Sequence, residues 1–357
     1  MREPVADLQD DDSTKDWGTR AMTVRIGING FGRIGRNYLR AARLLGADVE
    51  VVGINDLTSP ETLAHLLKYD STHGRFGSDV QVDGSNLVLD SGPIAVLAER
   101  DPKALPWSDL GADVIIESTG HFTSKESASA HLDAGAKRVI ISAPGTGVDA
   151  TFVVGVNDDQ FDPATDVVVS NASCTTNCFV PMVKVLDDAF GIDVGLMTTV
   201  HAYTNDQNLL DLTHHDLRRA RAAAVNIVPS STGAARATSL VLSAMKGRLD
   251  GTSLRVPIPD GSITDFTAIV RSTTVEEINA AFRAAAEGPL KGVLVYTEDP
   301  IVSSDIVGSP ASCTFDSLMT MVQRIDDDKS LVKIFGWYDN EWGYSNRLVD
   351  LTSFIGQ

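Results

Sequence analysis

One short loop near the start of the chain constrains its fold more than any other stretch. It reads Gly30-Phe31-Gly32-Arg33-Ile34-Gly35 and matches the pattern G-x-G-x-x-G. The run before it, TVRIGING, is typical of a strand, and the run after it, RIGRNYLRAARLLG, has helical spacing and ends at Gly46. Glycines between a strand and a helix permit a tight turn and let the backbone approach a pyrophosphate at the helix N-terminus. The loop therefore predicts a dinucleotide-binding βαβ unit.

An acidic residue follows where such a unit needs one. The apolar run VEVVGIND ends at Asp56. A carboxylate about 20 residues beyond the loop accepts a hydrogen bond from a ribose 2′-hydroxyl. Its negative charge would repel the 2′-phosphate of NADP, so we predict NAD as the cofactor.

Later runs extend the pattern into a complete fold. ADVIIESTG and KRVIISAPG again combine a buried strand with small residues, and helices that alternate with such strands predict a parallel sheet. Beyond Cys174 the pattern changes to a helix that contains Pro181, a strand through His201, a long polar loop over 204–228 and further strands. We predict an α/β chain, with a Rossmann-type doubly wound domain and an α+β catalytic domain that has a mixed sheet.

The predicted boundaries follow these changes in pattern. Residues 1–21 are acidic and lack apolar periodicity, which indicates a disordered extension. The NAD-binding domain is expected to take residues 22–173, with the final amphipathic helix in 339–357 returning to it. The catalytic domain is expected to take residues 174–338.

Charge and cysteine content exclude several classes of function. A formal net charge of −18 argues against a nucleic-acid-binding surface and against binding to an anionic membrane. No run approaches the ~20 apolar residues of a membrane-spanning helix. The cysteines, Cys174, Cys178 and Cys313, are too sparse and odd in number for a disulfide framework. We therefore expect a cytoplasmic protein that binds neither nucleic acid nor membrane.

Cys174 lies among small and polar residues in VVVSNASCTTNCFV, where a cysteine kept for packing would be unusual. It follows a strand, and Ser173 can cap the next helix, so the helix dipole is expected to lower the pKa of the thiol. His201, in the alternating run TTVHAYT, is either a core histidine bonded to backbone or a general base for this thiol. Cys178 is expected to pack. A Cys-x-x-x-Cys pair alone is poor evidence for zinc, so we predict no metal site.

A set of motifs runs in order from Gly27 to Arg347: GINGFGRIGR, YDSTHGRF, NASCTTNC, TTVHAYT, RRARAAAVNIVPSSTGAA, LRVP and WYDNEWGYSNR. Together they resemble the phosphorylating glyceraldehyde-3-phosphate dehydrogenases over nearly the whole chain after residue 22. The resemblance implies that NAD and inorganic phosphate convert glyceraldehyde 3-phosphate to 1,3-bisphosphoglycerate, in a homotetramer. Erythrose-4-phosphate dehydrogenase and a non-catalytic NAD-binding protein are the alternatives.

The resemblance also implies a role for each motif residue. Cys174 would attack the aldehyde carbon, giving a hemithioacetal and then a thioester, and His201 would take protons and steady the oxyanion. The residues expected to bind the C3 phosphate are Thr204, Asp206 and Arg255. Those expected to bind inorganic phosphate are Ser173, Thr175, Arg219, Thr232 and Gly233. The expected cofactor contacts are Gly32, Arg33, Ile34, Asp56, Arg100 and, at the nicotinamide carboxamide, Asn340.

Two departures from the family pattern bear on these expectations. Thr213 stands where NAD-preferring members often carry proline, which leaves the degree of NADP tolerance open. PIPDGSITD replaces the usual PTPNVSVVD, a change that we expect to affect subunit packing rather than the site.

Overall fold

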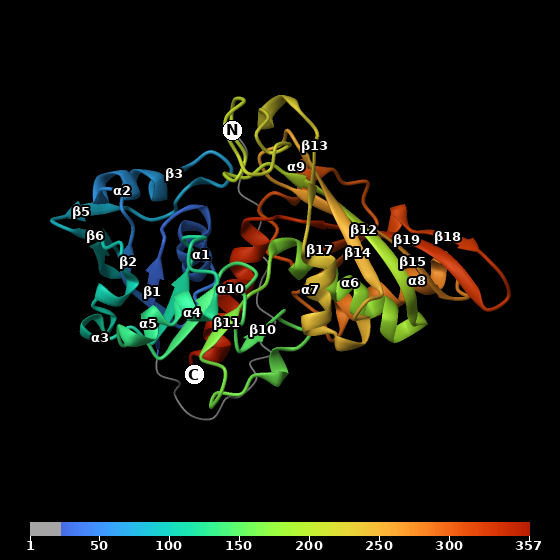
Figure 1. The fold of residues 1–357 in the computed structure, drawn as a ribbon, viewed down its shortest axis with the longest axis horizontal. Helices are drawn as coiled ribbons and strands as arrows, with labels where there is room; N and C mark the ends of the chain where they lie inside the picture. The colour runs from blue at the N-terminus through green and yellow to red at the C-terminus, as the bar shows by residue number, and fades with distance from the viewer. Residues whose placement is uncertain (1–22) are drawn as a thin grey trace.

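The computed structural model describes residues 23–357, so the extension predicted for residues 1–21 lies outside the described range. Two lobes lie side by side, each built on one large sheet, and the C-terminal helix α10 (Trp342–Ile355) lies between them (Figure 1). Within the described range, no helix combines the length and the apolar character needed to cross a membrane.

The first sheet has the strand order β10-β11-β9-β8-β1-β2-β7-β6-β5. Its strands are β1 (Val24–Asn29), β2 (Val49–Asn55), β5 (Gln81–Asp83), β6 (Asn86–Leu89), β7 (Gly92–Leu97), β8 (Val114–Glu117), β9 (Arg138–Ile141), β10 (Ala150–Thr151) and β11 (Val168–Ser170). Pairs from β10 to β7 are parallel, whereas β5 and β6 join antiparallel. Strand β1 lies at the centre of the sheet. The chain adds β2 and β5–β7 on one side of it and then β8–β11 on the other, which confirms the prediction of a doubly wound sheet.

Burial on both faces explains why the central strands of this sheet read as continuous apolar runs. Ile28 in β1 and Ile116 in β8 are fully buried. One face is covered by α1 (Arg33–Leu44) and α10, which contact each other. Leu348 and Leu351 of α10 belong to the same apolar core as Ile26 of β1, so the final helix packs against the first sheet.

The second sheet is mixed and has the order β13-β14-β12-β15-β19-β17-β16, with β18 paired to β19. Its strands are β12 (Ile192–Ala202), β13 (Val228–Ser231), β14 (Leu249–Val256), β15 (Ser262–Arg271), β16 (Leu294–Thr297), β17 (Cys313–Asp316), β18 (Met321–Arg324) and β19 (Lys329–Tyr338). The pairs β12·β14 and β16·β17 are parallel, and the other pairs are antiparallel. This arrangement confirms the predicted α+β architecture.

Three helices pack on one face of the second sheet: α6 (Cys174–Phe190), α7 (Ala234–Val241) and α8 (Val275–Glu287). The remaining α-helices of the described range are α2 (Pro60–Lys68), α3 (Trp107–Leu110), α4 (Lys125–Ala128), α5 (Ala130–Asp133) and α9 (Ser303–Ile306), and β3 (Tyr69–Asp70) and β4 (Gly74–Arg75) form a small hairpin. Helix α6 continues through Pro181 and is followed by its C-cap Gly191, whose φ of 66° suits glycine. Its first residue faces the junction of the two lobes.

Candidate active site

A strained turn presents Cys174 at the start of α6. Strand β11 ends at Ser170, and Ala172 then takes a φ of 56°, the one positive value for a non-glycine residue within 23–357. Backbone strain of this kind is typical of functional sites. The Ser173 hydroxyl accepts a hydrogen bond from the N–H of Thr176 at 3.1 Å and caps the helix. The thiol of Cys174 therefore lies at a helix N-terminus.

His201 reaches this thiol from the second sheet. Its Nε2 lies 3.4 Å from the Cys174 sulfur, and its Nδ1 lies 2.7 Å from the carbonyl oxygen of Ala202. A carbonyl only accepts, so Nδ1 carries the ring hydrogen and the lone pair of Nε2 faces the thiol. Arg255 of β14 is the direct register partner of His201 in β12. The arrangement can move a proton from sulfur to imidazole.

Burial sets the protonation state of this pair. It raises the pKa of the Cys174 thiol to about 11, against the opposing hydrogen bonds from Thr175 and the charge of Arg255. Burial, together with the Arg255 charge, lowers the pKa of His201 to about 4. The resting pair is thus an uncharged thiol and an uncharged imidazole. The sequence-based prediction of a lowered thiol pKa is wrong, because desolvation outweighs the helix N-terminus.

Alkylation of the unliganded protein by iodoacetamide tests this state. We expect the rate to rise about tenfold per pH unit from pH 7 to pH 10, since the thiolate fraction grows that way below the thiol pKa. Cys178 and Cys313 are fully buried, so labelling reports Cys174, and a Cys174→Ser variant should show none. A rate that levels off below pH 8 would contradict the uncharged pair.

Arg255 lies near the thiol and the imidazole, and Arg219 lies near Arg255. Arg255 donates through Nη1 to the Thr204 hydroxyl at 2.8 Å. Arg219 donates through Nη1 to a carboxylate oxygen of Asp206 at 2.6 Å. Its Nη2 donates to the carbonyl oxygen of Ser231 at 3.4 Å. Asp206, predicted for the C3 phosphate, thus bonds Arg219, which was predicted for inorganic phosphate. Guanidinium groups are suited to binding phosphate oxygens.

The hydroxyl residues of the predicted phosphate sites take different positions. Thr232 accepts from the N–H of Ala234 at 3.2 Å, and Gly233 begins α7 without a side-chain cap. The first N–H groups of any helix lack intrahelical partners, and at α7 the N-cap Gly233 supplies no side chain to bind them. Thr175 is buried, and its hydroxyl pairs with the Tyr338 hydroxyl at 2.9 Å. The Thr175 hydroxyl therefore points into the core, away from the predicted contact with inorganic phosphate.

The glycine loop leaves space for an anion at the start of α1. Gly30 has a φ of 92°, and a Cβ on Gly35 would lie 2.3 Å from the carbonyl oxygen of Gly30, so both positions require glycine. A Cβ on Gly32 would meet nothing within 4 Å, and Gly32 is the N-cap of α1 with no side-chain cap. The first backbone N–H groups of α1 therefore have no side-chain partner, and together with the open space at Gly32 they can bind a pyrophosphate.

Asp56 lies beside the loop at the same sheet edge. Its carboxylate accepts from the N–H of Phe31 at 2.9 Å and from that of Thr58 at 3.0 Å. The N–H of Asp56 also bonds the carbonyl of Leu97, the last residue of β7, at 3.0 Å. Arg100 follows three residues later in an exposed turn. The predicted ribose contact and Arg100 thus share the edge that carries the glycine loop.

The side chain of Arg33 has other partners. It forms ion pairs with Asp70 and Glu341, which are both buried more deeply than Arg33 itself. Only the backbone N–H groups of Arg33 and Ile34 therefore remain for the predicted cofactor contact. Asp70 and Glu341 were not among the predicted site residues, although they lie in the motifs YDSTHGRF and WYDNEWGYSNR.

Asn340 is held by Ser262, which was not among the predicted site residues either. The Ser262 hydroxyl donates to Oδ1 of Asn340 at 2.7 Å and accepts from the N–H of Ala202 at 3.1 Å. Ser262 thus links Asn340 to the residue after His201. A serine alternating with apolar residues in a strand gives little indication of this role.

Comparisons with known proteins agree with this geometry. Residues 24–125 match the family model "Glyceraldehyde 3-phosphate dehydrogenase, NAD binding domain", and residues 173–340 match "Glyceraldehyde 3-phosphate dehydrogenase, C-terminal domain". Glyceraldehyde-3-phosphate dehydrogenase 2 of Streptomyces avermitilis is 60% identical over 336 residues, 94% of this chain and 99% of the relative. The Streptomyces coelicolor enzyme is 61% identical over 337 residues, with the same coverage. The Geobacillus stearothermophilus enzyme is 58% identical over 335 residues, 94% of this chain and 98% of the relative.

Proposed function

The chain belongs to the glyceraldehyde-3-phosphate dehydrogenase family, and from that premise we propose which of its residues carry out the reaction. It oxidises glyceraldehyde 3-phosphate with NAD as cofactor. The observation that carries the assignment of the catalytic residues is the 3.4 Å contact between the sulfur of Cys174 and Nε2 of His201. We further propose that inorganic phosphate is the second substrate and that the product is 1,3-bisphosphoglycerate.

Backbone groups and three side chains hold the cofactor in this proposal. The N–H groups at Gly32 and after it bind the pyrophosphate, and Asp56 binds the ribose. Ser262 occupies Oδ1 of Asn340, which leaves the Nδ2 hydrogens for the nicotinamide carboxamide. Arg100 contacts the remaining part of the dinucleotide. NAD, when bound, supplies the acceptor for the hydride.

Cys174 and His201 then carry the covalent steps. The sulfur bonds to the aldehyde carbon while its proton passes to Nε2 and on to the carbonyl oxygen, which gives a hemithioacetal. His201 takes the hydroxyl proton back as the hydride leaves the carbon, and a thioester results. The N–H of Cys174 and the imidazole stabilise the negative oxygen. Phosphate attacks the thioester, the carbon–sulfur bond breaks, and the thiolate recovers its proton from His201.

In this proposal each of the two arginines binds one of the two phosphates. Arg255 with Thr204 binds the C3 phosphate, since Arg255 lies beside His201 in the sheet. Arg219, with Thr232 and Gly233, binds the attacking phosphate near the start of α7. Asp206 bonds Arg219 and keeps it oriented when no anion is bound. Ser173 completes the predicted set at the helix N-terminus.

Steady-state assays with and without inorganic phosphate test this function. We expect NADH formation from glyceraldehyde 3-phosphate to depend strongly on phosphate, because only phosphate releases the acyl group from Cys174 efficiently. Sustained turnover without phosphate would indicate a non-phosphorylating enzyme. Erythrose 4-phosphate serves as the comparison substrate, and a higher kcat/KM for it would contradict the proposed substrate.

Replacing Arg255 by glutamine tests the C3 phosphate site. We expect kcat/KM for glyceraldehyde 3-phosphate to fall by about 100-fold, since a charge-assisted contact with phosphate contributes about 2–3 kcal/mol. Glyceraldehyde without phosphate should react equally well with the variant and the original protein. Equal losses for both aldehydes would instead place Arg255 in the chemistry at the carbon.

Replacing Asp56 by asparagine tests the choice between cofactors. The variant removes the charge that repels a 2′-phosphate and keeps a side chain of the same size. We expect the ratio of kcat/KM for NAD to kcat/KM for NADP to fall by about tenfold. The control is Asp83→Asn, an exposed strand residue. An unchanged ratio would show that other residues, such as Thr213, set the preference.

The assembly and its location are part of the proposal. We propose a homotetramer in the cytoplasm, with domain boundaries at 22–173 plus 339–357 and at 174–338. The loop over 204–228 exposes a group of large apolar side chains, which supports its burial against a neighbouring subunit: Leu209, Leu210, Leu212, Leu217, Val225 and Ile227. Sedimentation velocity measures the assembly directly.

A further inference from the structure

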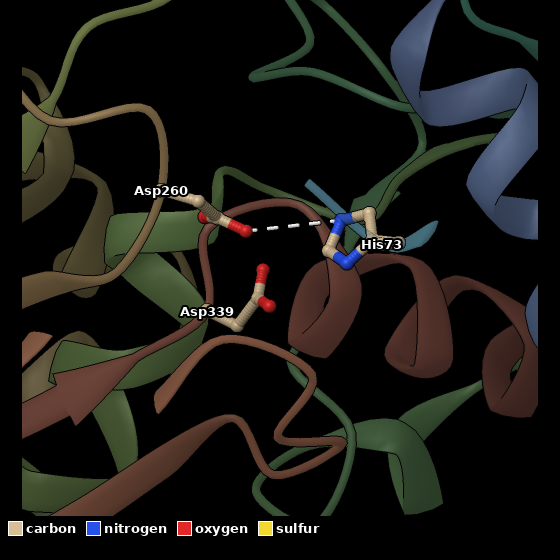
Figure 2. A group of neighbouring side chains, drawn as sticks. All are labelled: His73, Asp260 and Asp339. Carbon is tan, nitrogen blue, oxygen red and sulfur yellow. Dashed lines mark ion pairs between the residues drawn. The ribbon is translucent and has the colours of Figure 1, made fainter. Parts of the chain in front are cut away.

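We propose that His73, Asp260 and Asp339 form a binding site for one divalent cation of the Mn²⁺ or Zn²⁺ class, separate from the catalytic pair. Figure 2 shows the three side chains converging, with the ion pair between His73 and Asp260 marked. One ligand atom from each residue lies within 4.8 Å of the others. No role in the reaction proposed above uses these residues.

Three separate segments bring the cluster together at the junction of the lobes. His73 lies in the turn between β3 and β4, Asp260 in the turn between β14 and β15, and Asp339 between β19 and α10. The imidazole therefore comes from the first lobe, and Asp260 comes from the second sheet. A cation there would join the two lobes directly.

Asp260 supplies the observation that points to a ligand. The residue is 2% exposed, and its Oδ1 accepts from the N–H of Gly261 at 2.9 Å. Its Oδ2 has no hydrogen-bond partner among residues 23–357 and lies 3.7 Å from Nε2 of His73. Buried carboxylate oxygens are almost always paired, because an unpaired one loses its water without compensation. Oδ2 is therefore the Asp260 oxygen that a bound cation would satisfy.

The charges around Asp260 also favour a cation. Asp339 accepts from the N–H groups of Gly308, Glu341 and Trp342 at 2.7, 2.9 and 2.6 Å, which fix its carboxylate in place. Nε2 of His73 also lies 3.3 Å from Oε2 of Glu341, so carboxylates from three residues lie near this imidazole. The guanidinium of Arg33 is paired with Asp70 and Glu341. A divalent cation would balance the negative charge of these carboxylates.

The donor set selects the class of cation. A metal bonded at about 2.0–2.2 Å holds tetrahedral ligand atoms about 3.3–3.6 Å apart, close to the 3.7 Å between His73 and Asp260. One imidazole nitrogen with two carboxylates suits Zn²⁺ or Mn²⁺, whereas Mg²⁺ and Ca²⁺ favour oxygen ligands alone. The sequence-based expectation of no metal considered only the cysteines, and this cluster contains none.

Titration of the full-length protein with Mn²⁺, followed by the electron paramagnetic resonance of the free ion at 0.15 M salt, tests the proposal. Mn²⁺ is the probe because thiols bind it weakly, so Cys174 does not compete. We expect one bound ion per chain, and we expect Asp260→Asn to weaken its binding by at least tenfold. The matched control is Asp316→Asn, which makes the same change at a carboxylate that is 3% exposed and outside the cluster. It should bind Mn²⁺ like the original protein.

A second measurement keeps the test decisive if a variant is unstable. Mn²⁺ should raise the melting temperature of the original protein and of Asp316→Asn, and it should leave that of Asp260→Asn and His73→Gln unchanged. The proposal is overturned if the original protein binds no Mn²⁺ saturably. It is also overturned if Asp260→Asn and Asp316→Asn bind the ion equally well, since the acidic surface would then account for the binding.

Discussion

Replacing Cys174 by serine should lower kcat for aldehyde oxidation by about three to four orders of magnitude. A hydroxyl gives up its proton far less readily than a thiol. The acyl group of a serine ester is also transferred to phosphate more slowly than that of a thioester. His201 lies 3.4 Å from the sulfur and cannot compensate for the weaker nucleophile. Steady-state kinetics with glyceraldehyde 3-phosphate, NAD and phosphate measure the loss, and circular dichroism verifies the fold.

Cys178→Ser is the control for this result. Cys178 lies one turn further along α6, is fully buried and donates to the carbonyl of Gly336 at 3.5 Å. A serine there can keep the hydrogen bond, so kcat should stay within about twofold of the original value. If Cys174→Ser retained full activity, Cys174 would not be the nucleophile and the proposed mechanism would be wrong.

Replacing His201 by asparagine should lower kcat by about 100- to 1,000-fold at pH 6, because the site loses its base. The loss should shrink toward pH 9. Burial raises the pKa of the Cys174 thiol to about 11, so the thiolate fraction without His201 increases steadily over this range. The original protein keeps its base, since the imidazole pKa is lowered to about 4 and the ring is uncharged at both pH values. Profiles of kcat against pH measure the difference.

His121→Asn separates this effect from a general loss of imidazole. His121 is exposed, and its backbone N–H bonds the Thr119 hydroxyl, so the change should leave the pH profile unaltered. An equal loss at pH 6 and pH 9 for His201→Asn would show that His201 positions the thiol rather than accepting its proton.

Local pattern was enough to predict the elements that carry the site. The glycine loop requires a strand before it and a helix after it, and β1 and α1 lie there. The Ser173 cap was likewise visible in the sequence, because a hydroxyl before a helical run satisfies a free N–H group. These features depend on residues that are close together along the chain.

Features that depend on tertiary packing were not predictable in this way. The direction of the Cys174 pKa shift depends on how deeply the second sheet buries the sulfur, which no local pattern records. The partners of Arg33 come from residues 37 and 308 positions away. Thr175 turns to Tyr338 because β19 passes beneath α6, an arrangement set by the sheet order.

The return of α10 to the first sheet has a consequence for synthesis on the ribosome. Leu348, Leu351 and Ile355 complete the apolar core that contains Val24 and Ile26, yet they are translated more than 300 residues later. The nascent first lobe therefore emerges with α1 on that face of the sheet and the part that α10 covers still exposed. The N-terminal lobe cannot finish folding ahead of the rest, as N-terminal domains usually do, and needs protection from aggregation until translation ends.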